Sequence, residues 1–336
     1  MSTRVAVIGD GAMATLCAII LAENGHAVRL WSAFPAAAEE LARTRENRRF
    51  LPGHPLPQAV EVTADDAAAL DGAEVAIQAV PTQFVRHWWS RLTKYCPKSL
   101  PICSTAKGIE NRTLLRPSQV VLEVLGDANP TPRPIAVLTG PSIAPQVARR
   151  LPATVTVAAN RPGFAEQIQV LFNRPYFRVY TNPDLIGVEV AGAVKNVVAI
   201  AAGILDGLGA GDNAKASLVT RGLAEITRLG VAMGARRETF AGLAGVGDLI
   251  TTCTSPQGRN RSFGEAVGRG RSVEQALAAT QSVIEGVATT ASVVELAARL
   301  GVEMPITQAV HSVLFAGRSP AEAIADLMNR PLKAEG

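Results

Sequence analysis

The feature that most constrains the fold is a glycine-containing turn near the N-terminus, set between a strand pattern and a helix pattern. Arg4–Ile8 is a short apolar run of the kind buried on both faces of a parallel sheet. It leads into Gly9–Ala14, which reads Gly-Asp-Gly-Ala-Met-Ala, and then into a helical stretch that extends to about Asn24. A second strand pattern follows at Ala27–Trp31. The sequence therefore predicts a strand–helix–strand unit of about 30 residues.

The spacing of this turn, G-x-G-x-x-A, is typical of dinucleotide-binding folds. Gly9 allows the tight turn, Gly11 lets the backbone approach a pyrophosphate, and Ala14 permits close packing of helix on strand. The helix N-terminus attracts phosphate groups because its N–H groups are unpaired and its dipole is positive there. We therefore expect the turn to bind NAD or NADP.

Strand and helix patterns continue to alternate through the first half of the chain. Further strand patterns lie at Ala59–Thr63, Val75–Ala79, Leu100–Ser104, Ile135–Leu138, Ala153–Ala158 and Phe177–Tyr180. Because helical stretches fall between most of them, the sequence predicts an α/β fold with a doubly wound, Rossmann-like, mainly parallel sheet of about eight strands. Ligands bind such sheets at the carboxyl ends of the strands.

The strand pattern stops near Asn182–Asp184, and only helices are predicted beyond it. We therefore expect a dinucleotide-binding domain at residues 1–184 and an all-α substrate and catalytic domain at residues 185–336; 336 residues suffice for two cores. The predicted helices are Gly187–Leu205, Asp212–Met233, Phe240–Leu243, Gly264–Arg269, Val273–Ala279 and Thr289–Leu300, followed by two more.

The first of these helices, Gly187–Leu205, is apolar on all sides, so most of its circumference should be buried. Its many small residues would let neighbouring elements approach its backbone closely. Lys195 and Asn196 stand in its middle. A buried ammonium is costly unless it is paired or neutral, and desolvation lowers its pKa, which makes a lysine a usable acid or base near neutral pH. The alternative is that Lys195 snorkels to the surface.

Polar residues gather at places where a ligand could bind. Lys107 and Ser142 follow two predicted strands and make a plausible anion pocket, although polar residues are ordinary in loops. The segment Gly245–Arg261 carries a carboxylate, hydroxyls, a guanidinium and a carboxamide, and the sequence predicts a flexible interhelical loop there. Arg259 suits a bidentate grip on phosphate, with Asn260 beside it. The density of polar groups favours binding over a merely solvated loop.

Composition excludes some classes of protein. The net charge of +4 is scattered without a Lys/Arg run, which disfavours nucleic acid as a partner. The four cysteines lack metal-ligand spacing, so we expect no metal site and a reducing compartment. No signal-peptide pattern is present, and apolar runs are interrupted well before about 18 residues. We expect a cytoplasmic protein without stable membrane insertion.

These segments together resemble the NAD(P)-dependent glycerol-3-phosphate dehydrogenases, particularly the bacterial type, over nearly the whole chain. The matching segments are Gly9–Ala14, Arg48–Gly53, Lys107–Glu110, Gly140–Ser142, Gly192–Asn196, Thr220–Ala224, Gly247–Leu249, Arg259–Arg261, Val283–Gly286 and Gly301–Ile306. The lysine–asparagine helix and the segment from Asp248 to Arg261 are specific to this family, whereas the glycine turn is not.

The resemblance implies that Lys195 is the general acid/base that interconverts sn-glycerol 3-phosphate and dihydroxyacetone phosphate with NAD(P)(H). It implies substrate contacts from Lys107, Gly140, Ser142, Lys195, Asn196, Asp248, Thr252, Gly258, Arg259 and Asn260. It implies cofactor contacts from Gly9, Gly11, Ala12, Met13, Lys107, Ala144, Arg259, Val283 and Glu285. It also implies a homodimer that supplies glycerol 3-phosphate for glycerophospholipid synthesis.

The chain departs from the bacterial pattern at three places. Ala12-Met13 stands where serine and tryptophan are usual, Gly258 replaces a serine, and the basic residue usual after the second strand is missing. Because Ser32 and Ala33 offer neither a carboxylate nor a guanidinium, we expect weak discrimination between NAD and NADP. Two alternatives stay open: a related two-domain reductase of β-hydroxyacids or keto acids, and a dinucleotide-binding sensor without catalysis.

Overall fold

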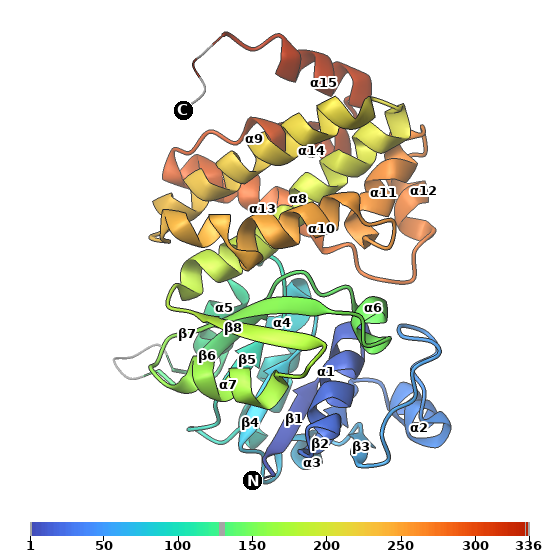
Figure 1. Ribbon diagram of the computed structural model, residues 1–336, viewed down its shortest axis with the longest axis vertical. Coiled ribbons are helices and arrows are strands. Elements are labelled where there is room, and N and C mark those ends of the chain that lie inside the picture. The colour runs from blue at the N-terminus through green and yellow to red at the C-terminus, as the bar shows by residue number, and fades with distance from the viewer. Residues whose placement is uncertain (1, 128–131, 333, 335–336) are drawn as a thin grey trace.

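The computed structural model describes residues 2–127, 132–332 and 334, and it joins a sheet half to a helical half (Figure 1). Within these residues one sheet contains eight strands: β1 Arg4–Ile8, β2 Ala27–Trp31, β3 Val60–Thr63, β4 Val75–Gln78, β5 Ile102–Ser104, β6 Ile135–Thr139, β7 Ala153–Ala159 and β8 Phe177–Asn182. Their order is β3-β2-β1-β4-β5-β6-β7-β8, and only β6 and β7 pair antiparallel. The predicted α/β fold is confirmed, and each predicted strand is found with small shifts at its ends.

Helices cover both faces of the central sheet, which explains why β1, β4, β5 and β6 are buried almost throughout, whereas the edge strands β3 and β8 carry exposed residues. The helices of this half are α1 Ala12–Glu23, α2 Pro35–Thr44, α3 Asp66–Leu70, α4 Thr82–Leu92, α5 Pro117–Val124, α6 Ala144–Ala148 and α7 Phe164–Phe172, with a 3₁₀ turn η1 at Thr93–Tyr95. Val5 and Val7 of β1 pack into one core with α1 and α7, whereas Ala6 and Ile8 pack into the opposite core with α4 and α5.

The helical half is built around the long helix α8, Leu185–Leu208, which is buried from Gly187 to Leu205. The elements around it are α9 Gly211–Ala232, the 3₁₀ turn η2 Arg237–Ala241, the π-turn η3 Leu243–Gly247, α10 Asp248–Thr254, α11 Arg259–Gly268, α12 Val273–Ala278, α13 Glu285–Leu300, α14 Pro305–Phe315 and α15 Pro320–Met328. By length and composition α8 could cross a membrane, but 83% of its apolar window is buried inside this fold. It is therefore the core helix that the sequence predicted.

Glycines bring α11 directly against α8. A Cβ atom at Gly203 of α8 would lie 1.9 Å from the carbonyl oxygen of Arg261, and one at Gly264 of α11 would lie 2.1 Å from that of Ile200. No side chain fits at either position unless a backbone moves. The expected close approach to this helix is confirmed, and it fixes the first turn of α11 relative to Lys195.

The prediction of a flexible loop over Gly245–Arg261 is wrong. The segment contains the end of η3, all of α10 and the start of α11, so the helix predicted to begin at Gly264 begins at Arg259. Threonine hydroxyls of α10 donate to carbonyls one turn back, from Thr251 to Gly247 at 3.0 Å and from Thr252 to Asp248 at 2.7 Å. These bonds satisfy polar side chains within a helix, so a polar composition did not indicate a loop here. The helix predicted at Phe240–Leu243 is likewise replaced by η2 and η3.

Candidate active site

The carboxyl ends of the parallel strands point toward the helical half, as Figure 1 shows. The loop after β5 carries Lys107, and β6 ends at Thr139. Opposite them, α8 contributes Lys195 and α10 begins with Asp248. The structure brings these four side chains together although they come from distant parts of the sequence.

Lys195 is only 4% exposed, so it does not snorkel to the surface. Its Nζ lies 2.5 Å from Oγ1 of Thr252, 3.3 Å from Oδ1 of Asn196 and 3.3 Å from Oδ1 of Asp248. Burial lowers the pKa of Lys195 to about 8, although the Asp248 carboxylate pulls it upward. Lys195 therefore exchanges its proton close to neutral pH, inside a cage of three oxygen atoms.

Asp248 is 2% exposed, and its carboxylate contacts two lysines at once. While one oxygen faces Lys195, Oδ2 accepts a hydrogen bond from Nζ of Lys107 at 2.8 Å. Lys107 also donates to the carbonyl of Gly140 at 3.2 Å, and Thr139 donates weakly to Oδ2 at 3.4 Å. The carboxylate of α10 thus ties both strand-end loops to the helical half.

Asn196 fixes the same loop from α8. Its Nδ2 donates to the carbonyl of Lys107 at 3.0 Å, which directs Oδ1 toward Lys195. Gly140 has φ +136°, and a Cβ there would lie 2.9 Å from the Cα of Val155, so only glycine fits. The Ser142 hydroxyl donates to the Gly140 carbonyl at 3.0 Å. The predicted substrate residues Lys107, Gly140, Ser142, Lys195, Asn196, Asp248 and Thr252 therefore form one connected group.

A second group of predicted residues lies at the N-terminus of α11. Gly258 is the N-cap residue and provides no side-chain cap. Arg259 is exposed, and within the described residues its guanidinium makes one long contact, of 3.5 Å, to the carbonyl of Val283. Asn260 is buried, and its Oδ1 accepts from the N–H of Gly286 at 3.0 Å. An uncapped helix N-terminus beside an exposed guanidinium suits an anion.

The glycine turn has the form expected for phosphate binding. Gly9 adopts φ +123° and packs against Ala79, where a Cβ would lie 3.0 Å from the carbonyl oxygen. Gly11 is the N-cap of α1, has no side-chain cap, and would direct a Cβ into open space. The first N–H groups of α1 are therefore accessible, and the turn fits a pyrophosphate. Ala12 and Met13 form the first turn of α1.

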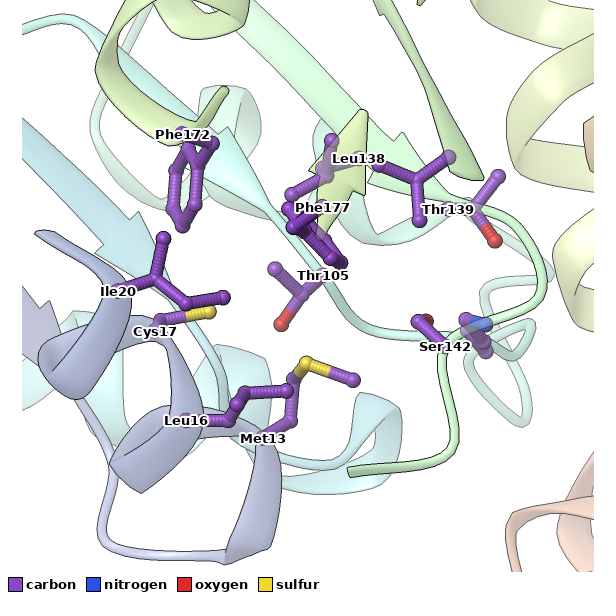
Figure 2. Close-up of a pocket in the computed structure, with 12 residues that line it drawn as sticks. Met13, Leu16, Cys17, Ile20, Thr105, Leu138, Thr139, Ser142, Phe172 and Phe177 are labelled. Carbon is purple, nitrogen blue, oxygen red and sulfur yellow. The ribbon is translucent and has the colours of Figure 1, made fainter. Parts of the chain in front are cut away.

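Met13 also links the turn to the strand-end loops. It lines a narrow, mainly apolar pocket between α1 and the sheet. In Figure 2 the Met13 side chain extends from α1 toward Thr105 and Ser142, which line the same pocket. The lining residues are Met13, Leu16, Cys17, Ile20, Thr105, Lys107, Leu138, Thr139, Ser142, Val155, Phe172 and Phe177. Ala144, which begins α6, is two residues beyond Ser142.

The two remaining predicted cofactor residues stand at the start of α13. Glu285 accepts from the N–H and the hydroxyl of Thr82 at 3.0 and 3.1 Å, which joins α13 to the N-terminus of α4. Val283 is 39% exposed and faces Arg259 with its carbonyl. Thr82 is not among the predicted site residues, although it belongs to a polar stretch, Val80–Thr82, that follows a predicted strand.

Sequence reasoning also overlooked Asp10. Its Oδ2 accepts a hydrogen bond from the Ser32 hydroxyl at 2.5 Å. Asp10 is the variable residue between the two glycines of the turn, and Ser32 directly follows β2. Asp10 is part of the glycine motif and Ser32 follows the second strand pattern, but only the fold shows that their side chains meet.

The family models that match are the N-terminus of NAD-dependent glycerol-3-phosphate dehydrogenase, over residues 4–165, and its C-terminus, over residues 184–325. The chain is 47% identical over 336 residues to glycerol-3-phosphate dehydrogenase (NAD(P)+) of Geobacter sp. (strain M21), with 100% of both chains covered. It is 49% identical over 333 residues to the protein of the same name from Geobacillus kaustophilus (strain HTA426), covering 99% of this chain and 96% of that one.

Solved structures agree. The crystal structure of glycerol-3-phosphate dehydrogenase from Coxiella burnetii is 38% identical, with a TM-score of 0.93 and coverage of 98% and 99%. A ketopantoate reductase family structure from Ralstonia eutropha JMP134 is 16% identical with a TM-score of 0.60, which shows a shared fold alone. Both halves of the chain, the lysine site between them and the full-length relatives lead to one conclusion: the chain belongs to the NAD-dependent glycerol-3-phosphate dehydrogenase family.

Proposed function

We propose that this protein interconverts sn-glycerol 3-phosphate and dihydroxyacetone phosphate with NAD or NADP; its relatives are named glycerol-3-phosphate dehydrogenase (NAD(P)+). The observation that carries the proposal is the buried amine of Lys195, whose pKa is lowered to about 8 mainly by burial. Such a group takes and returns a proton near neutral pH.

In the oxidation, the neutral amine of Lys195 takes the proton of the C2 hydroxyl; in the reduction, the ammonium donates a proton to the C2 carbonyl. A bound nicotinamide would accept or supply the hydride. The oxygens of Thr252 and Asn196 orient Nζ, since they lie 2.5 and 3.3 Å from it. Asp248 stabilises the ammonium form when it is produced.

The phosphate of the substrate would bind at the start of α11. Arg259 supplies an exposed guanidinium, Gly258 leaves the first N–H groups of the helix uncapped, and Asn260 lies beside them. Lys107, Gly140 and Ser142 would line the opposite side of the substrate. Gripping the phosphate there would aim C2 at Lys195, and fixed orientation of this kind contributes to the rate.

The predicted cofactor residues, like the substrate residues, come from both the sheet half and the helical half. We propose that Gly9, Gly11, Ala12 and Met13 hold the pyrophosphate at the N-terminus of α1. The residues Lys107, Ala144, Arg259, Val283 and Glu285 would surround the rest of the dinucleotide. A role in supplying glycerol 3-phosphate for glycerophospholipid synthesis, a homodimeric state and a cytoplasmic location follow only from the resemblance, and we propose them on that basis.

Oxidation of NADH and NADPH, followed by absorbance with dihydroxyacetone phosphate and with a panel of keto acids, tests the proposal. We expect turnover with dihydroxyacetone phosphate and very poor turnover with dihydroxyacetone, which lacks the phosphate. Faster turnover of a keto acid would replace the proposal by the keto-acid reductase alternative. Cofactor binding without turnover of any substrate would support the sensor.

A further inference from the structure

The carboxylate of Asp10 lies at the place where dinucleotide-binding folds recognise the adenosine ribose. In such folds an acidic residue at the end of the second strand binds the ribose 2′-hydroxyl. Here that position is taken by Ser32, which directly follows β2, and the Ser32 hydroxyl donates to Oδ2 of Asp10 at 2.5 Å. The glycine turn thus supplies the carboxylate that the second strand lacks.

Hydrogen bonds hold both residues in position. The carbonyl of Asp10 accepts from Nδ2 of Asn47 at 2.7 Å, and that same amide also donates to the Thr15 hydroxyl at 2.7 Å. Ser32 is fully buried, and its N–H donates to the carbonyl of Thr63 at 3.0 Å. Asp10 is partly exposed, and Oδ1 accepts no hydrogen bond within the described residues. One oxygen is therefore anchored, and the other is open to a ligand hydroxyl.

We propose that Asp10, positioned by Ser32, binds the ribose 2′-hydroxyl of the cofactor and makes the protein prefer NAD(H) to NADP(H). An ionised carboxylate accepts a hydrogen bond from this hydroxyl, but it repels the 2′-phosphate that NADP carries in its place. The expectation of weak discrimination takes only Ser32 and Ala33 into account, whereas the fold adds the carboxylate of Asp10 beside Ser32. This inference rests on the proposed function only in requiring that the chain binds a nicotinamide dinucleotide.

The surroundings of the pair are consistent with this assignment. Phe34, two residues beyond Ser32, is 58% exposed, so an aromatic surface is available to an adenine ring nearby. Two cations, Arg48 and Arg49, follow Asn47 and are exposed, so they are candidates to receive a 2′-phosphate instead. Arg48 pairs with Glu46 at 3.4 Å, and the guanidinium of Arg49 lies 4.8 Å from the Phe50 ring centroid. Both therefore have partners, whereas Oδ1 of Asp10 is free among the described residues.

Dissociation constants of NADH and NADPH, measured by fluorescence titration of the purified protein without substrate, test the inference. We expect the parent to bind NADH more tightly by at least about tenfold, or about 1.4 kcal/mol. Asp10→Asn should bring the ratio of the two constants close to one, because NADPH binding tightens and NADH binding weakens. Ser32→Ala keeps the carboxylate, so NADH binding should weaken without a gain for NADPH.

Asp71→Asn is the matched control, since Asp71 is an exposed carboxylate in the turn before β4, at the amino end of the sheet. It should leave both dissociation constants unchanged.

A parent that prefers NADPH, or an unchanged ratio of the two constants in Asp10→Asn, would overturn the inference. If Asp10→Asn does not fold, the parent alone tests the inference: AMP and adenosine 2′,5′-bisphosphate are each used to displace NADH. We expect AMP, which lacks the 2′-phosphate, to bind more tightly. Selective NADH binding without reduction of dihydroxyacetone phosphate would count against the proposed function alone.

Discussion

Lys107 and Asp248, separated by 141 positions in the sequence, form a hydrogen-bonded ion pair with Nζ 2.8 Å from Oδ2. Lys195 lies 3.3 Å from the other oxygen of the same carboxylate. One buried carboxylate therefore faces two amines, and it does not fully compensate two ammonium charges. Lys107 accordingly helps to lower the pKa of Lys195, after burial itself.

Replacing Lys195 with Met should lower kcat by roughly 10²–10⁴, the usual contribution of a general acid–base group. The fold and NADH binding should persist, because methionine suits an apolar core helix and Asp248 keeps Lys107 as its partner. Steady-state kinetics and cofactor titration measure both effects. Lys98→Met, at an exposed lysine before β5, is the matched control. Near-normal turnover in Lys195→Met would remove Lys195 from the chemistry.

The pH dependence of kcat/KM should differ in the two directions. The pKa of Lys195 is lowered from 10.5 to about 8, and kcat/KM reports groups of the free enzyme. Oxidation of glycerol 3-phosphate requires the neutral amine, so its rate should rise with pH and level off above about 8. Reduction of dihydroxyacetone phosphate requires the ammonium, so its rate should fall through the same range. Profiles with the same slope in both directions would contradict the assignment.

Replacing Asp248 with Asn should lower the pKa of Lys195 further, because the carboxylate raises it. The rise of the oxidation rate should therefore occur at lower pH than in the parent. The change also leaves Lys107 without its ion-pair partner, and removing one member of a buried pair costs about 3–5 kcal/mol of unfolding free energy. pH–rate profiles and urea unfolding measure the two effects. A profile displaced to higher pH would show that Asp248 does not act on Lys195.

Replacing Arg259 with Ala should cost about 2–4 kcal/mol in kcat/KM for the phosphorylated substrate, as expected when one side of a charge pair is lost. The exposed guanidinium at the uncapped start of α11 is the reason for this expectation. If Arg259 were only a surface residue, the change would cost less than about 0.5 kcal/mol. Kinetics with dihydroxyacetone phosphate and with dihydroxyacetone separate the two views. An equal loss on both substrates would mean that Arg259 is not the phosphate anchor.

Replacing Gly264 with Ala should lower the unfolding free energy by about 1–3 kcal/mol, the usual cost of overpacking a core. The added Cβ would lie 2.1 Å from the carbonyl oxygen of Ile200, so α11 must move away from α8. Since α11 begins with Arg259, kcat/KM should fall as well. Gly247→Ala is the control for stability, because its Cβ would meet nothing closer than 3.5 Å. Equal stability of the two variants in urea would contradict this account of the helix contact.

Much of the fold could be predicted from local patterns. The central strands of the sheet are covered on both faces, so they are short, buried runs between helical stretches, and every predicted strand is present. The apolar circumference of its helix predicted buried surroundings for Lys195 but left snorkelling as an alternative, which the 4% exposure of Lys195 excludes. The prediction of a loop was wrong at α10. Its threonines make the sequence polar like a loop, but their hydroxyls donate to carbonyls within the helix.

The sequence by itself determined the order of elements, the glycine turn and the lysine within a core helix, since these depend on residues close together in the chain. Only the tertiary structure decided which side chains meet. It placed Asp248 between Lys107 and Lys195, and it brought Asp10 to Ser32. Such contacts depend on how the sheet and the helices pack, and local periodicity carries no information about a partner that lies many residues away.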